Sequence, residues 1–279
     1  MAGSGNLIFD PQEVSAAKKI AVLFPGALAE VSIFDAADKW CDEGYALVRY
    51  RFPGLDGRPL HPPLKIAEAA GEVATFLRQF SGKTTRLLGY STGGAIALTT
   101  AALVGGDLRV ALMSCAVEAG GGIQTGLRGA LDIAGAATRA GSLSRRAIWL
   151  EYYKTLLFGR HGRTSPQAVA LIKERLDRIV MPEGDLPRAH TDDLRRWRLP
   201  DARRLPPAAQ MRLFVGLEDP VFSLDQSRAM AARLGGAAVT GYAGQGHLLF
   251  LTEPAVFDDI LAFFEDREPP AGTKGLSSG

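Results

Sequence analysis

Short apolar runs, each long enough for a buried strand, alternate with longer amphipathic stretches from residue 18 onward. The runs expected to be strands are residues 18–26, 45–54, 84–90, 108–117, 211–222 and 237–247. The stretches expected to be helices are residues 33–44, 64–82, 92–105, 223–236 and 252–267. The runs are apolar throughout, which is typical of strands buried on both faces. The alternation predicts an α/β fold, with a mostly parallel central sheet and helices on both faces.

The alternation is interrupted between residues 118 and 207, where no convincing strand occurs. The stretches 147–158 and 165–180 have helical periodicity, and several prolines end the segment. We therefore expect a helical cap inserted before the penultimate strand. The expected units are 1–117 (first part of the core), 118–207 (cap), 208–267 (second part of the core) and 268–279 (a disordered tail).

Composition narrows the class of protein without defining a function. A chain of 279 residues with a formal net charge of +2 gives no reason to expect nucleic acid or an anionic membrane as a partner. Cys41 and Cys115 have no neighbouring thiol, so we expect two reduced, mostly buried side chains. No signal peptide or bilayer-spanning run is recognisable, which predicts a cytoplasmic protein without membrane insertion. The oligomeric state is left open.

The segment LLGYSTGG, residues 87–94, places one serine between glycines directly after an expected strand. Ser91 is therefore expected at a sharp strand-to-helix turn at the carboxyl edge of the sheet. Side chains at positions 89 and 93 would collide with the adjoining strand and helix, which explains both glycines. The alternative is an ordinary hydroxyl in a glycine-rich turn, so a nucleophilic role depends on a base and an acid elsewhere in the chain.

A serine hydroxyl becomes a good nucleophile only when a base takes its proton, and the chain has four histidines. His61 lies in a proline-rich loop, and His161 and His190 fall within the helical insertion. His247 follows the last expected strand in the glycine-rich stretch GQGHLLF. It is therefore the candidate base.

The candidate acid is Asp219, at the end of the strand that precedes the histidine loop. A carboxylate at this position would fix the tautomer of the base and stabilise its imidazolium form. The neighbouring Glu218 is expected to be solvated. Glu118, after the fourth strand, is a second possible source of the carboxylate.

Serine turn, acid and histidine, in that chain order and each after a strand, resemble the α/β-hydrolase family. The resemblance extends over residues 18–267 and includes the position of the cap. It implies that Ser91 is the nucleophile, Asp219 the acid and His247 the base.

The same resemblance implies an oxyanion hole made of two backbone N–H groups. One belongs to Thr92, which follows the nucleophile. The other comes from the loop after the first expected strand, where many relatives have His-Gly and this chain has Pro25 and Gly26. We expect the N–H of Ala27 to be the second donor, with the N–H of Leu28 as the alternative.

Several aromatic residues are candidates for lining an apolar substrate pocket. Tyr90, Trp149 and Tyr153 are the substrate-binding candidates, and Tyr152 and Trp197 could contribute to the same wall. Packing of the cap onto the sheet would explain each of these residues equally well.

The insertion is rich in arginine, in three tight groups: Arg145, Arg146, Arg195, Arg196, Arg198, Arg203 and Arg204. These residues could attract an anionic substrate such as an acyl thioester of a phosphorylated carrier. The favoured interpretation is a solvated surface partly neutralised by Asp192, Asp193 and Asp201, since no phosphate-binding loop accompanies the arginines.

The expected function is a serine hydrolase that cleaves a small-molecule carboxylic ester through an acyl-enzyme on Ser91. This chemistry requires no metal and no organic cofactor. Relatives with the same triad act on thioesters, lactones or carbon–carbon bonds, or transfer the acyl group to acceptors other than water. Two further alternatives are a ligand-binding relative without turnover and a scaffold that binds a protein through the arginine-rich cap.

Overall fold

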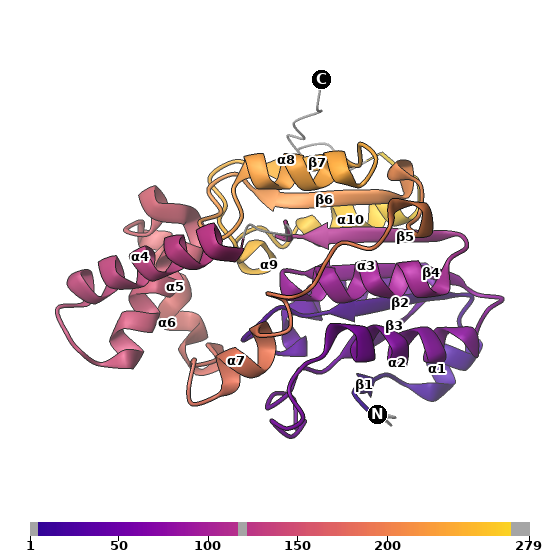
Figure 1. Ribbon diagram of the computed structural model, residues 1–279, viewed down its shortest axis with the longest axis horizontal. Coiled ribbons are helices and arrows are strands. Elements are labelled where there is room, and N and C mark those ends of the chain that lie inside the picture. The colour runs from indigo at the N-terminus through magenta and orange to yellow at the C-terminus, as the bar shows by residue number, and fades with distance from the viewer. Residues whose placement is uncertain (1–4, 117–121, 269–279) are drawn as a thin grey trace.

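The computed structural model describes residues 5–116 and 122–268 of the chain. Within these ranges a seven-stranded sheet forms the centre of the molecule, in the order β1-β3-β2-β4-β5-β6-β7 (Figure 1). The strands are β1 (Leu7–Ile8), β2 (Lys19–Phe24), β3 (Tyr45–Tyr50), β4 (Thr84–Tyr90), β5 (Leu108–Met113), β6 (Met211–Gly216) and β7 (Ala238–Tyr242). Strand β1 pairs antiparallel with β3, and every other neighbouring pair is parallel. The predicted α/β fold is therefore confirmed.

Helices cover both faces of the sheet. They are α1 (Pro11–Ala16), η1 (Val31–Glu43), α2 (Ile66–Arg78), α3 (Thr92–Val104), α4 (Gly122–Ala140), α5 (Arg145–Gly162), α6 (Pro166–Arg175), η2 (Leu176–Arg178), α7 (Leu186–Thr191), η3 (Ala202–Arg204), η4 (Ala208–Gln210), α8 (Leu224–Arg233), α9 (Leu249–Thr252) and α10 (Val256–Phe264), where η marks a 3₁₀-helix. Successive residues of a strand point to opposite faces. Ile20 and Val22 of β2 accordingly belong to the same core cluster as residues of α2, α3 and α8, whereas Ala21 and Leu23 belong to a second cluster with residues of η1 and α10.

Of two expectations about the stretch between β2 and β3, the helix is present and the burial of Cys41 needs correction. Its apolar residues Phe34, Ala37 and Trp40 recur every three positions, and the stretch forms a 3₁₀-helix, whose side chains align at that spacing. Cys41 comes directly after the buried Trp40 and is exposed, so only Cys115 of the two thiols is buried. A one-residue step around this helix carries a side chain away from the sheet.

The segment between β5 and β6 holds α4 to α7 and, among its described residues 122–207, contains no strand. We call these residues the insert. Figure 1 places α4, α5 and α6 beyond the carboxyl ends of β5 and β6, where the strand arrows point. The expectation about Glu118 lies outside the described residues, as does all but residue 268 of the expected disordered tail, 268–279.

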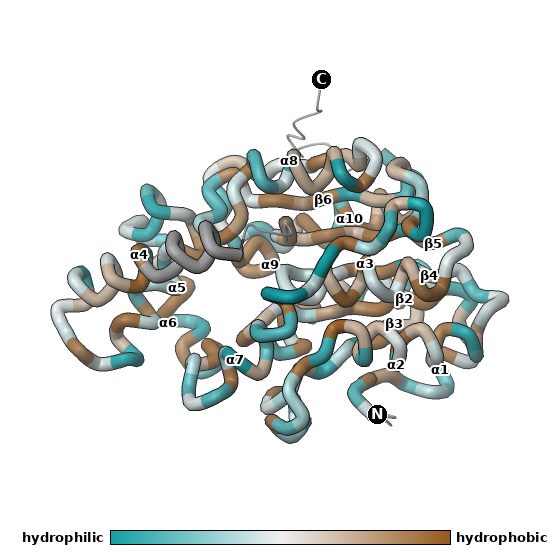
Figure 2. The backbone as a smooth tube through the Cα atoms, viewed as in Figure 1, coloured by the Kyte–Doolittle hydropathy of each residue, from teal (hydrophilic) through white to brown (hydrophobic). Residues whose placement is uncertain are grey.

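Hydropathy follows the layers of the fold. Figure 2 shows hydrophobic residues along the central strands and hydrophilic residues along the connection that follows α7. The described helices include none with the length and apolar character needed to span a bilayer.

Candidate active site

Ser91 occupies the tight turn between β4 and α3. Its backbone has φ 49° and ψ −119°, a conformation that non-glycine residues rarely adopt and that is characteristic of functional turns. A Cβ atom at position 89 would lie 2.5 Å from the Cα of Gly94, and one at position 93 would lie 2.2 Å from the carbonyl oxygen of Phe24. Both glycines are therefore required for β4, α3 and β2 to approach one another.

The structure brings Ser91, His247 and Asp219 together at the carboxyl edge of the sheet. His247 Nδ1 lies 2.8 Å from Asp219 Oδ2, and His247 Nε2 lies 3.2 Å from Ser91 Oγ. Since an ionised carboxylate only accepts hydrogen bonds, Nδ1 carries the proton and Nε2 presents a lone pair to the serine hydroxyl. This geometry suits transfer of the hydroxyl proton to Nε2.

Asp219 is held by its own loop, three residues after the end of β6. Its Oδ1 accepts hydrogen bonds from the backbone N–H groups of Val221 (2.7 Å) and Phe222 (3.0 Å). The side chain is 1% exposed, so these hydrogen bonds are shielded from water. Glu218 is exposed to solvent, as expected from the sequence.

The other three histidines lie away from Ser91. His61 and His161 are exposed. His190, on α7, is buried, but its Nδ1 accepts a hydrogen bond from the backbone N–H of Leu28 (3.0 Å) and its Nε2 lies 2.6 Å from the carbonyl oxygen of Pro53. Burial lowers the pKa of His190 below its usual value, and the charge of Arg58 adds to this effect.

The loop after β2, residues 25–31, runs beside the serine turn, and we call it the β2 loop. Position 26 has no room for a side chain, since a Cβ there would lie 2.9 Å from Ser91 Cβ. Thr92 N–H opens α3 and therefore has no intrahelical acceptor. Within the described part of the chain, neither Thr92 N–H nor Ala27 N–H donates a hydrogen bond, whereas Leu28 N–H is engaged by His190.

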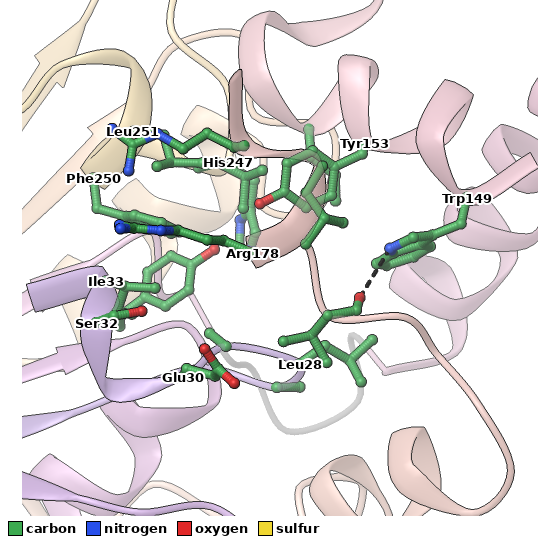
Figure 3. A pocket seen from close by; sticks show the side chains of 18 residues that line it. Leu28, Glu30, Ser32, Ile33, Trp149, Tyr153, Arg178, His247, Phe250 and Leu251 are labelled. Atoms are coloured by element: carbon green, nitrogen blue, oxygen red, sulfur yellow. Dashed lines mark hydrogen bonds between the residues drawn. The ribbon is translucent and has the colours of Figure 1, made fainter. Parts of the chain in front are cut away.

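A cavity of about 100 Å³ reaches His247 from the side of the insert (Figure 3). Its walls are the β2 loop, the start of η1, α5, the stretch from α6 to Val180, and the residues that follow His247. The lining residues are Ala27, Leu28, Ala29, Glu30, Ser32, Ile33, Tyr90, Trp149, Tyr153, Leu156, Arg175, Arg178, Ile179, Val180, His247, Leu248, Phe250 and Leu251. Figure 3 shows Tyr153, Arg178 and His247 on one side of this space, opposite Leu28 and Glu30.

The aromatic candidates divide into two groups. Tyr90, Trp149 and Tyr153 line the cavity, and Trp149 Nε1 donates to the carbonyl oxygen of Val180 (3.0 Å). Tyr152 instead packs against Trp149 in the core, and Trp197 donates to Thr99 Oγ1 on α3 (3.0 Å). Burial raises the pKa of Tyr90 and of Tyr153, so both phenols are neutral at physiological pH.

Three charged residues that the sequence analysis did not single out line the cavity: Glu30, Arg175 and Arg178. Arg175 and Arg178 are three residues apart, so their side chains leave the same face of the α6–η2 stretch.

None of the seven clustered arginines of the insert lines this cavity. Arg203 pairs with Asp201 (2.7 Å) and Arg195 with Asp192 (3.8 Å), in keeping with a solvated surface. Arg175 and Arg178 lie in an ordinary amphipathic stretch, so only the docking of the insert distinguishes them.

The described residues include no group of three or more His, Cys, Asp or Glu side chains arranged to hold a metal ion. The hydrogen-bonded side chains at the carboxyl edge are a serine, a histidine and an aspartate. The class of protein defined by the fold and this site is an α/β protein with a mostly parallel sheet and a hydrogen-bonded Ser-His-Asp group at its carboxyl edge.

Comparison with known proteins agrees with this class. Residues 21–260 match the model of the Alpha/beta hydrolase family, and the chain therefore belongs to this family. A search of curated proteins found no match.

Similar solved structures cover nearly the whole chain at low sequence identity. MGS-M2, an alpha/beta hydrolase enzyme from a Medee basin deep-sea metagenome library, is 13% identical with a TM-score of 0.73, and 94% of each chain is covered. A thermophilic esterase from Thermogutta terrifontis is 16% identical with a TM-score of 0.67, and 93% of each chain is covered. A lipase-esterase related protein from Clostridium acetobutylicum is 15% identical with a TM-score of 0.63, covering 92% of this chain and 98% of the other.

Proposed function

We propose that the protein is a serine hydrolase that cleaves a carboxylic ester through an acyl-enzyme on Ser91. The observation that carries this proposal is the continuous hydrogen-bonded chain from Ser91 Oγ through His247 to Asp219, at 3.2 Å and 2.8 Å. A ligand-binding relative without turnover would not need this chain of contacts.

In the proposed reaction His247 Nε2 takes the proton of Ser91 as Oγ attacks the ester carbonyl. The tetrahedral oxyanion is held by the N–H groups of Thr92 and Ala27, and Leu28 N–H is already used by His190. His247 then returns the proton to the leaving alcohol, and water repeats the cycle on the acyl-enzyme. Asp219 stays ionised and stabilises the imidazolium.

We propose that the insert caps the site and that its contribution to the cavity selects small acyl groups. The cavity of about 100 Å³ is smaller than an apolar cavity of roughly 150 Å³ that admits benzene. Esters with acyl chains from acetyl to butyryl are therefore the expected substrates. Arg175 and Arg178 at the wall favour an acyl chain that ends in a carboxylate, although Glu30 at the wall and Glu174, 3.2 Å from Arg175, partly offset their charge.

A panel of nitrophenyl esters with acyl chains of increasing length, including one short chain that ends in a carboxylate, tests the proposal. A thioester and a lactone of matched size are assayed beside it. Ser91→Ala should reduce turnover by about 10⁴-fold or more, because the nucleophile is lost. The matched control is Ser81→Ala, which changes an exposed serine outside the site and should have no effect.

A fluorophosphonate probe separates an enzyme from a binding protein. The parent protein and Ser81→Ala should be labelled, and Ser91→Ala should not. Turnover of the esters that survives in Ser91→Ala, or a parent protein that neither hydrolyses the panel nor reacts with the probe, would rule out the proposed function.

A further inference from the structure

The β2 loop carries a strained residue beside the amide of Ala27. Leu28 has φ 58°, in the left-handed region that costs a non-glycine residue roughly 1–2 kcal/mol. Such a conformation persists only where its surroundings hold it in place. Two side chains from outside the loop do so, through hydrogen bonds to Leu28 N–H and Val31 N–H.

The first of these side chains is His190, which reaches the loop from α7 of the insert. It is 1% exposed, and it packs edge-on against Phe52 with ring centroids 5.2 Å apart. Pro53 offers only a carbonyl oxygen, so Nε2 must carry the proton, and Nδ1 is then the acceptor for Leu28 N–H. The second side chain is Asp56, whose Oδ2 accepts from Val31 N–H at 3.0 Å.

We propose that His190 is a positioning residue, which acts through Leu28 to fix the Ala27 amide where the oxyanion forms. This inference rests on the proposed function. His190 contacts neither Ser91 nor the cavity. Its role is to fix the position of the β2 loop relative to α7. A misplacement of about 1 Å at a reacting group can cost roughly 100-fold in rate, so one hydrogen bond outside the site can matter.

The bond to Leu28 requires a neutral ring. Imidazolium carries a proton on both nitrogens and cannot accept from an N–H group. The charged side chains on the packed elements are Arg51, Asp56 and Arg58 in the loop after β3 (residues 51–60), Arg188 on α7, Asp185 and Asp192 at the two ends of α7, and Glu30 in the β2 loop. Arg58 disfavours a second positive charge on His190.

Two substitutions separate the two hydrogen bonds of the ring. His190→Asn keeps an acceptor near the position of Nδ1 and loses the group that reaches Pro53. His190→Gln keeps a donor near the position of Nε2 and loses the acceptor for Leu28. Both remove the aromatic ring, so each controls for the packing defect of the other.

For the best ester of the panel, His190→Gln should lower kcat about 10- to 100-fold with KM nearly unchanged, because a misplaced amide affects the transition state. His190→Asn should stay within about 3-fold of the parent. At low pH kcat of the parent should fall more steeply than kcat of His190→Asn, because protonation of His190 removes the acceptor for Leu28 N–H and asparagine has no such titration.

Amide hydrogen exchange at Leu28 gives a readout that does not depend on turnover. It should be faster in His190→Gln than in His190→Asn and the parent. Equal kcat losses in the two variants, or equal exchange at Leu28, would overturn the role assigned to His190. A parent protein without Ser91-dependent hydrolysis would refute the proposed function. Even then, equal exchange at Leu28 in the two variants would separately refute the claim that His190 holds the loop in place.

Discussion

Asp219 divides its two carboxylate oxygens between its own loop and the histidine. Oδ1 accepts from two backbone N–H groups and Oδ2 accepts from His247 Nδ1. The two backbone bonds therefore fix the orientation of the carboxylate, and the carboxylate fixes the tautomer of the His247 ring. At the scale of single residues, the site depends on which atom carries each proton.

Asp219→Asn tests this dependence. The amide keeps the shape of the carboxylate, but it can present an N–H group to His247 and so favour the wrong tautomer. We expect kcat for ester hydrolysis to fall by about 10³- to 10⁴-fold, with the free energy of unfolding little changed. The control is Asp225→Asn on α8, whose side chain is 94% exposed and which should leave kcat unchanged. Retention of most activity in Asp219→Asn would contradict the assigned tautomer.

The serine turn could be predicted from the sequence because its glycines and its serine form a short motif. Gly89 is required by contacts with Gly93 and Gly94, and Gly93 is required by the approach of the β2 backbone. His190 and Arg178 belong to no recognisable sequence motif. Each lies in an ordinary helical stretch, and its role depends on where the insert docks.

At the scale of elements, α5 is interrupted where it meets the histidine loop. Phe158 and Gly159 leave the helical conformation, which frees the carbonyl oxygens of Leu156 and Leu157 from intrahelical hydrogen bonds. These oxygens accept from the backbone N–H groups of Leu248 (3.1 Å) and Gly246 (2.8 Å). The residues on both sides of His247 are therefore anchored to the insert.

Gly159→Ala should damage this anchor. Gly159 has φ 71° and ψ −174°, a region restricted to glycine, and a Cβ there would lie 2.5 Å from Glu218 Cβ. We expect a loss of about 2–4 kcal/mol in the free energy of unfolding, measured by urea denaturation, and a lower kcat.

Gly141→Ala is the matched control. Gly141 also has a positive φ, 57°, but a Cβ there would meet nothing within 4 Å. It should cost about 1 kcal/mol and leave kcat unchanged. If the two variants behaved alike, the contact between α5 and the Glu218 backbone would have no role in the site.

The strands were easier to predict than the other elements. All six expected strands are present, because long apolar runs with turn residues at their ends have few alternatives. Strand β1 is too short to leave a periodic pattern, since it consists of Leu7 and Ile8. The 3₁₀ character of η1 was missed because apolar residues three apart also suit an α-helix.

At the scale of the whole molecule, the buried neutral His190 makes stability depend on pH. The unfolded chain takes up this proton as the pH falls below about 6.5, whereas the folded chain resists it because burial lowers the pKa of His190. The unfolded state then binds more protons, so the free energy of unfolding should fall between pH 7.5 and 5.5, by up to about 1.4 kcal/mol per pH unit.

Urea denaturation of the parent and of His190→Asn at both pH values measures this contribution. The difference between the two proteins isolates His190 from the other titrating groups, and the parent should lose more stability on acidification. Equal losses would mean that His190 is not held neutral in the folded protein.

The arrangement of the core was accessible from the sequence, and the arrangement of the insert was not. Alternating strands and helices restrict a chain to few topologies. No comparable rule governs how α4 to α7 pack over the edge of a sheet. Their helical periodicity identified buried faces, but it did not indicate which partner each face would meet.

The interruption in α5 limits how the insert can move. Swinging α5 outward as a rigid body would break the bonds to Gly246 and Leu248, on either side of His247. We therefore expect substrate to reach the interior between side chains at the rim, with the backbone of the insert left in place. Excision of α4 to α7 should remove the anchor of the residues around His247 and, with it, the proposed hydrolysis.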